Sequence, residues 1–81
     1  MVDKVNSALE KAFPGIDLDL ELLSNGRITG TAVWDGFIGL DQVDRQTKIR
    51  SALRAALGSD AAIAGVIFTY TADELRAMKA A

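Results

Sequence analysis

The stretch IDLDLELLSNGRITGTAVW, residues 16–34, decides the fold of this chain because it predicts a β-hairpin. In residues 16–22, apolar side chains alternate with acidic ones, which is typical of a strand with one buried face and one solvated face. Asn25 and Gly26 follow, and this pair favours a tight hairpin turn because both residues tolerate a positive φ. Residues 28–34 form the predicted second strand, in which Gly30 indicates a bulge or a close backbone approach.

A helix is predicted before the hairpin, over residues 3–13. Val5, Leu9 and Phe13 recur at i, i+4 and i+8, the spacing of one helix face. Asp3 is the expected N-cap, and the Pro-Gly pair that follows the segment ends it.

A second helix is predicted after the hairpin, over residues 42–57. Asp41 is its expected N-cap, and Gly58 stands where helices commonly end. The apolar stripe of this helix consists of Ile49, Ala52, Leu53, Ala56 and Leu57.

The last part of the chain predicts a third strand and a short helix. Residues 63–70 are apolar nearly throughout, which favours a central strand buried on both faces. Residues 71–74, Thr-Ala-Asp-Glu, form a capping box that opens the last helix, with Leu75 and Met78 expected to face inward.

The predicted order is therefore α-β-β-α-β-α, an α+β fold in one domain over residues 1–81. The hairpin strands are antiparallel, and the third strand can pair in parallel because a helix precedes it. We expect a two-layer α/β sandwich with a three-stranded mixed sheet. Its predicted core includes Leu18, Leu20, Ile49, Leu53 and Ile67.

Cysteine and histidine are both absent, which excludes most catalytic and metal-binding chemistry. There is no thiolate nucleophile, no imidazole base near pH 7, and no soft metal ligand. We therefore expect no enzyme activity, no catalytic residue, no metal site and no cofactor. No apolar run could span a membrane, and the first residues lack the order of a signal peptide, so we expect a cytoplasmic protein. A chain of this size would be a monomer or a weak homodimer.

The segment after the hairpin carries a family resemblance. Phe37, Gly39 and Arg45 have the spacing of Phe-x-Gly, five residues, then Arg, and apolar residues follow along the helix. Residues 69–71, Thr-Tyr-Thr, with Glu74 close behind, match the end of the last strand and the start of the last helix. In these features the chain resembles the BolA-like family over nearly its whole length.

The resemblance implies a fold similar to class II KH domains. It also implies association with monothiol glutaredoxins that share an iron–sulfur cluster, and DNA binding and transcription regulation in the stress response. Gln46 and Ile63 stand where the family has histidines, so the chain offers no metal ligand at either position. We therefore expect a regulatory or adaptor domain that binds a protein partner, with a monothiol glutaredoxin as one candidate. The expected partner-binding residues are Phe37, Gly39, Arg45, Gln46 and Lys48.

The alternative function is nucleic-acid binding. Residues 36–39, Gly-Phe-Ile-Gly, match the Gly-x-x-Gly loop with which KH domains clamp a nucleic-acid backbone, and the middle helix is the most basic segment. The residues of this site would be Gly36, Gly39, Arg45, Lys48, Arg50 and Arg54. A simpler interpretation takes the loop as a tight turn with Phe37 in the core and the basic residues as a solvated helix surface. On the same view, Gln46 is a surface amide.

Overall fold

Three helices and a three-stranded sheet follow one another in the predicted order α-β-β-α-β-α. The computed structural model describes residues 2–80. Its elements are α1 (Val2–Ala12), β1 (Asp17–Leu22), β2 (Ile28–Val33), α2 (Gln42–Leu57), β3 (Ala64–Tyr70) and α3 (Ala72–Ala80). Two 3₁₀ segments, η1 (Asp35–Phe37) and η2 (Gly58–Ile63), flank α2. The predicted α+β class is therefore confirmed, and the predicted bounds of the middle helix match those of α2.

The sheet has the strand order β1-β2-β3. β1 runs antiparallel to β2, with Leu20 opposite Gly30, and β3 runs parallel to β2, with Phe68 opposite Thr31. The sheet is mixed, as predicted, but the prediction that the third strand is central was wrong. β3 is an edge strand, and its apolar run reaches solvent on the open face of the sheet, where Val66 is 60% exposed and Phe68 is 53% exposed.

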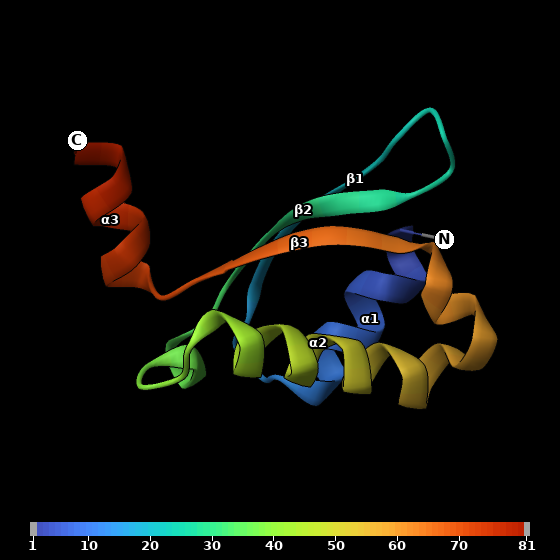
Figure 1. The fold of residues 1–81 in the computed structure, drawn as a ribbon, viewed down its shortest axis with the longest axis horizontal. Helices are drawn as coiled ribbons and strands as arrows, with labels where there is room; N and C mark the ends of the chain where they lie inside the picture. Colours follow the sequence, from blue (N-terminus) through green and yellow to red (C-terminus); the bar gives the residue numbers. More distant parts are fainter. Residues whose placement is uncertain (1, 81) are drawn as a thin grey trace.

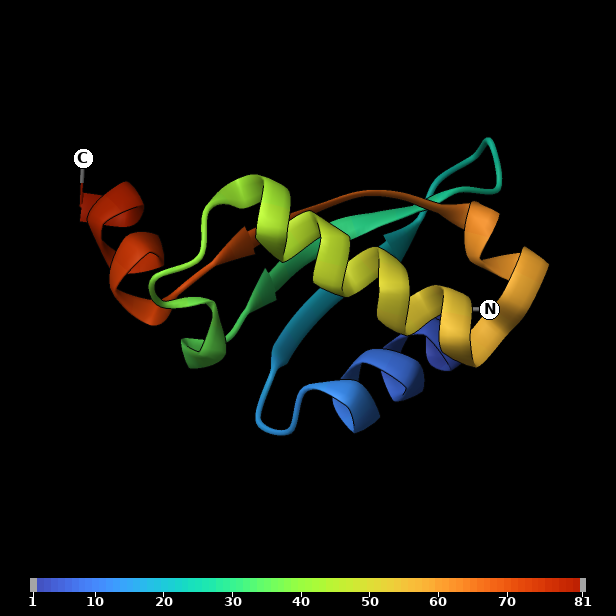
Figure 2. The same ribbon diagram turned by 60° about the horizontal axis from the view of Figure 1, so that its bottom comes forward.

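Helices α1 and α2 lie side by side against one face of the sheet, as Figures 1 and 2 show. Between these two layers lies the core, which contains Val5, Leu9, Phe13, Ile16, Ile28, Ala32, Phe37, Ile49, Leu53 and Ile67. The predicted burial of Ile49, Leu53 and Ile67 is confirmed. Leu18 and Leu20 pack against this core but are only half-buried, since β1 forms the other edge of the sheet.

Helix α3 departs from the prediction. It projects away from the sheet at the end of β3 (Figure 1), and it contains no buried residue. Leu75 is half-buried and Met78 is 51% exposed, because α1 and α2 already cover the face that α3 was expected to share. Leu22, at the hairpin end of β1, is likewise exposed and not in the core.

Helix ends follow local signals with one exception, and one residue of the predicted apolar stripe of α2 is not buried. The Asp41 side chain accepts a hydrogen bond from the backbone N–H of Asp44 (2.8 Å), which confirms the predicted N-cap of α2. Asp3 lies in the first turn of α1 and is not its cap. Ala56, predicted in the apolar stripe of α2, is exposed.

Two glycines fix the shape of the hairpin. Gly26 has φ +83°, and the neighbouring Asn25 side chain accepts a hydrogen bond from the N–H of Arg27 (3.0 Å). Gly30 has φ +154°, and a Cβ at this position would collide with the carbonyl oxygen of Asp19 on β1. The predicted close backbone approach at Gly30 is therefore confirmed.

None of the helices within residues 2–80 has both the length and the apolar character needed to cross a bilayer.

Candidate functional site

Arg45 lies inside the protein and joins three segments. It is 4% exposed, and its Nε donates a hydrogen bond to the carbonyl oxygen of Leu40 (2.9 Å). Its Nη1 and Nη2 donate to the two carboxylate oxygens of Glu74 at 2.6 and 3.0 Å, and Nη1 also lies 3.4 Å from the carbonyl oxygen of Thr69. The solvated-surface interpretation was wrong for Arg45, because it stands one turn before Ile49 on the inward face of α2. We call Leu40, Arg45, Thr69 and Glu74 the Arg45 junction.

The capping box of α3 shares this junction. Glu74 accepts a hydrogen bond from the backbone N–H of Thr71 (2.8 Å), and Thr71 Oγ1 accepts one from the N–H of Glu74 (3.2 Å). The hydrogen bonds from Arg45 and then from the Thr71 backbone lower the pKa of the Glu74 carboxyl to about 2. The same carboxylate raises the pKa of Arg45. The Glu74 side chain is 45% exposed, so water screens this ion pair on one side.

Phe37 and its turn shape the start of α2. Phe37 is fully buried, packs edge-on against Trp34 with ring centroids 5.3 Å apart, and carries the guanidinium of Arg45 above its ring at 5.7 Å. This confirms the interpretation of the Gly-x-x-Gly segment as a turn that places Phe37 in the core. Gly39 is exposed with φ +84°, while the Trp34 ring lies where a Cβ at Gly36 would stand.

Two glutamines of α2 bind the outer edge of β3. Gln46 Nε2 donates a hydrogen bond to the carbonyl oxygen of Ile67 (2.7 Å). Gln42 Nε2 donates to the carbonyl oxygen of Thr69 (3.2 Å), and the Thr69 hydroxyl donates back to Gln42 Oε1 (2.6 Å). Gln46 is therefore more than a surface amide. The sequence does not predict the contact of Gln42 with β3. The i, i+4 spacing of Gln42 and Gln46 indicates a shared contact only when β3 is known to be an edge strand.

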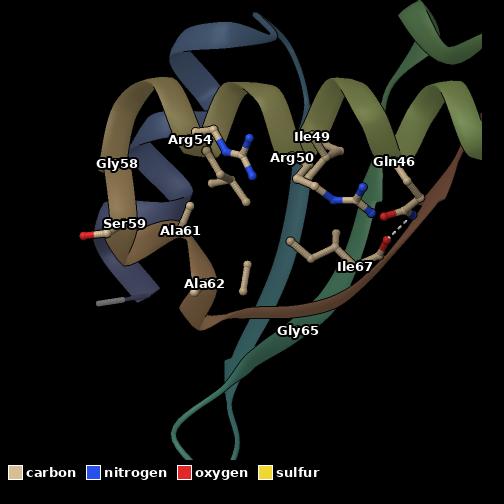
Figure 3. A pocket seen from close by; sticks show the side chains of 12 residues that line it. Gln46, Ile49, Arg50, Arg54, Gly58, Ser59, Ala61, Ala62, Gly65 and Ile67 are labelled. Atoms are coloured by element: carbon tan, nitrogen blue, oxygen red, sulfur yellow. Dashed lines mark hydrogen bonds between the residues drawn. The ribbon is translucent and has the colours of Figure 1, made fainter.

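A pocket of about 330 Å³ lies between α2, η2 and the first half of β3. Its lining residues are Gln46, Ile49, Arg50, Leu53, Arg54, Gly58, Ser59, Ala61, Ala62, Ala64, Gly65 and Ile67. Figure 3 shows the side chains of Arg50 and Arg54 on the α2 side of this space, with Ala62 and Ile67 opposite. Aliphatic side chains such as Ile49 and Leu53 line it beside these charges. We refer to this space as the α2–β3 pocket.

The structure brings together only part of each predicted site. Gln46, Arg50 and Arg54 line the α2–β3 pocket, and we call them the β3 flank of α2. Lys48 is exposed but lies about 200° around the helix from both Gln46 and Arg50, at ~100° per residue. Gly36 and Gly39 do not line the pocket, because they precede the opposite end of α2.

The chain does not fit an iron–sulfur cluster. Gln46 offers an amide and Ile63 only hydrocarbon, both poor substitutes for imidazole or thiolate as iron ligands. Within residues 2–80, no group of three histidine, cysteine, aspartate or glutamate side chains lies close enough to hold a metal ion.

The sequence matches no protein-family profile and no curated protein. Among solved structures, BolA1 from Arabidopsis thaliana is similar, with a TM-score of 0.74 and 23% sequence identity. The match covers 89% of this chain and 92% of that chain. The chain therefore has a BolA-like fold, as the resemblance in its sequence implied.

Proposed function

We propose that this chain is a BolA-like regulatory or adaptor domain that acts by binding a protein partner and is not an enzyme. The observation that carries the proposal is the BolA-like fold, which extends over nearly all of both compared chains. Phe37 and Arg45, two residues that carry the family resemblance, support the proposal because both have structural roles. Phe37 lies in the core. Arg45 is the buried titratable side chain within residues 2–80, and its guanidinium donates hydrogen bonds to Leu40, Thr69 and Glu74.

A monothiol glutaredoxin is the first partner to test, since the BolA-like family is associated with these proteins. The present chain would contribute protein contacts to such a complex but no ligand to a cluster, because it has neither histidine nor cysteine. We also propose a role in stress response or transcription regulation through this partner. The proposed compartment is the cytoplasm, where a chain without disulfides is at no disadvantage.

Only part of the predicted partner-binding set can touch a partner. Gly39 and Lys48 are exposed, and Gln46 is half-buried at the edge of the α2–β3 pocket. Phe37 and Arg45 are buried, so their contribution would be to hold α2 and the preceding turn in place. Substitution of Phe37 or Arg45 would therefore change the stability of the fold, and any loss of binding could follow from that change.

The test is a direct binding measurement. The purified protein is titrated calorimetrically with the monothiol glutaredoxin of its own organism, without and with a bound cluster, and partners that co-purify from the source cell are identified by mass spectrometry. We expect a saturable complex with a defined stoichiometry. The proposal fails if no purified protein partner binds.

Nucleic-acid binding is the second candidate, favoured by the two guanidinium groups on the β3 flank. Gel shifts with single-stranded and duplex probes over a range of salt concentrations would detect it, because phosphate contacts give steep salt slopes. The net charge of −2 and the separation of Gly36 and Gly39 from Arg50 and Arg54 make this candidate the weaker one.

A further inference from the structure

Arg50 and Arg54 form a pair of like charges that folding does not explain. They stand at i, i+4 on α2, where two equal charges destabilise a helix slightly. Within residues 2–80, the salt bridges are Arg45 with Glu74 and Arg76 with Asp73, so neither Arg50 nor Arg54 has a carboxylate partner. In a chain whose net charge is −2, this pair is a local concentration of unneutralised positive charge.

The pair borders a hollow whose lining is partly polar and partly aliphatic. Small residues on η2 and β3, among them Ala61, Ala62 and Gly65, leave the space open. Ile49, Leu53 and Ile67, which are almost fully buried, lie at its base. Its volume of about 330 Å³ is enough for a side chain the size of leucine or phenylalanine. Figure 3 shows both guanidinium groups beside this hollow, on the same side of it.

We propose that the α2–β3 pocket binds an acidic peptide segment of the protein partner. An apolar side chain of the segment enters the hollow, and neighbouring carboxylates pair with Arg50 and Arg54. Guanidinium groups suit this role because their planar donors match a carboxylate with two parallel hydrogen bonds. This inference rests on the proposed function and gives it a surface and a partner chemistry.

A peptide fits the pocket better than a single-stranded nucleic acid does. No aromatic side chain lines the pocket, whereas sequence-tolerant binding of single strands relies on aromatic rings that stack on bases. The packed aromatic cluster of Phe13, Trp34 and Phe37 lies outside the pocket lining.

The probe is a short fluorescein-labelled peptide with a central leucine flanked by glutamates, and binding is followed by fluorescence anisotropy. We expect Arg50→Glu and Arg54→Glu each to weaken binding about tenfold or more, since charge reversal turns attraction into repulsion. The control is Lys79→Glu, which makes a positive-to-negative change on an exposed residue of α3 that lies outside the pocket lining and outside the predicted partner-binding set. It should leave the affinity unchanged, and a peptide with lysines in place of the glutamates should not bind.

Three results would overturn the inference: no binding of the acidic peptide, an equal loss in the Lys79→Glu variant, or displacement of the peptide by a single-stranded oligonucleotide that binds more tightly. The glutaredoxin titration separates this inference from the proposed function. If the Arg50→Glu and Arg54→Glu variants bind the partner as tightly as the unmodified protein does, the pocket is not the docking surface, but the adaptor function stands. If no partner binds the unmodified protein, the adaptor function fails whatever the peptide does.

Discussion

Leu53→Ala tests the central packing contact of α2. Leu53 is 2% exposed and belongs to the core cluster, so its truncation removes buried methyl groups and leaves a cavity. Large-to-small changes of this kind cost ~2–5 kcal/mol. Leu53 also lines the α2–β3 pocket, where water and neighbouring side chains can fill part of the space. We therefore expect a cost at the lower end, about 2–3 kcal/mol.

Such a loss is large for a domain of 81 residues. At ~0.05–0.15 kcal/mol per residue, the free energy of unfolding is about 4–12 kcal/mol. The melting temperature should fall by roughly 10–20 °C, since a domain of this size loses ~4–8 °C per kcal/mol.

Urea unfolding followed by the fluorescence of Trp34 measures the change, because this single tryptophan packs against Phe13 in the core. Val43→Ala is the matched control, since Val43 is on the same helix and 73% exposed; its cost should stay within ~0.5 kcal/mol. Asn25→Ala, which removes a turn hydrogen bond, should fall between the two. Equal urea midpoints for Leu53→Ala and Val43→Ala would refute the placement of Leu53 in the core.

Three further substitutions test other contacts. Gly30→Ala should lower the free energy of unfolding by about 1–3 kcal/mol, because the new Cβ meets the Asp19 carbonyl; an unchanged urea midpoint would contradict the close approach. Glu74→Gln should lower the melting temperature most above pH ~5, and the difference from the unmodified protein should shrink as the pH falls toward 2. The reason is that a carboxyl with a lowered pKa stabilises the folded state only while it is ionised. A difference in melting temperature that stays constant down to pH 2 would show that the ion pair with Arg45 does not cause it. Gln46→His should change the absorption of a cluster-loaded glutaredoxin more than the unmodified protein does, and equal changes would reveal a ligand elsewhere.

The parts of the fold that could be predicted from the sequence are those that depend on near neighbours in the chain. The cap of α2 by Asp41 and the capping box between Thr71 and Glu74 each join residues three apart, so their patterns are visible in the sequence. Strand order is different, because nothing within residues 63–70 says which neighbours they have. The apolar run therefore predicts a central strand, although Val66 and Phe68 face solvent on an edge strand.

The same division applies to the candidate site. The basic character of α2 was evident, but its division into separate surfaces depends on what each side of the helix meets. Arg45 shares the inward face with Ile49, and its burial could have been predicted from that spacing had a partner charge been known. That partner is Glu74, which lies 29 residues away and reaches Arg45 only because β3 returns past the start of α2.

If the proposed binding role of Arg50 and Arg54 holds, helix α2 separates folding from binding among its own charged residues. A buried guanidinium is stabilising only when it is paired and hydrogen-bonded, and Arg45 meets this condition through Leu40 and Glu74. Arg50 and Arg54 meet no such condition within the described chain, and they lie on an exposed side of the helix where their replacement removes little packing. Changes at Arg45 should therefore act on the unfolding free energy, while changes at Arg50 and Arg54 should act mainly on affinity and only slightly on stability. Arg45, Arg50 and Arg54 all belong to α2. A partner that docks at the pocket would therefore contact a surface whose position the Arg45 junction fixes.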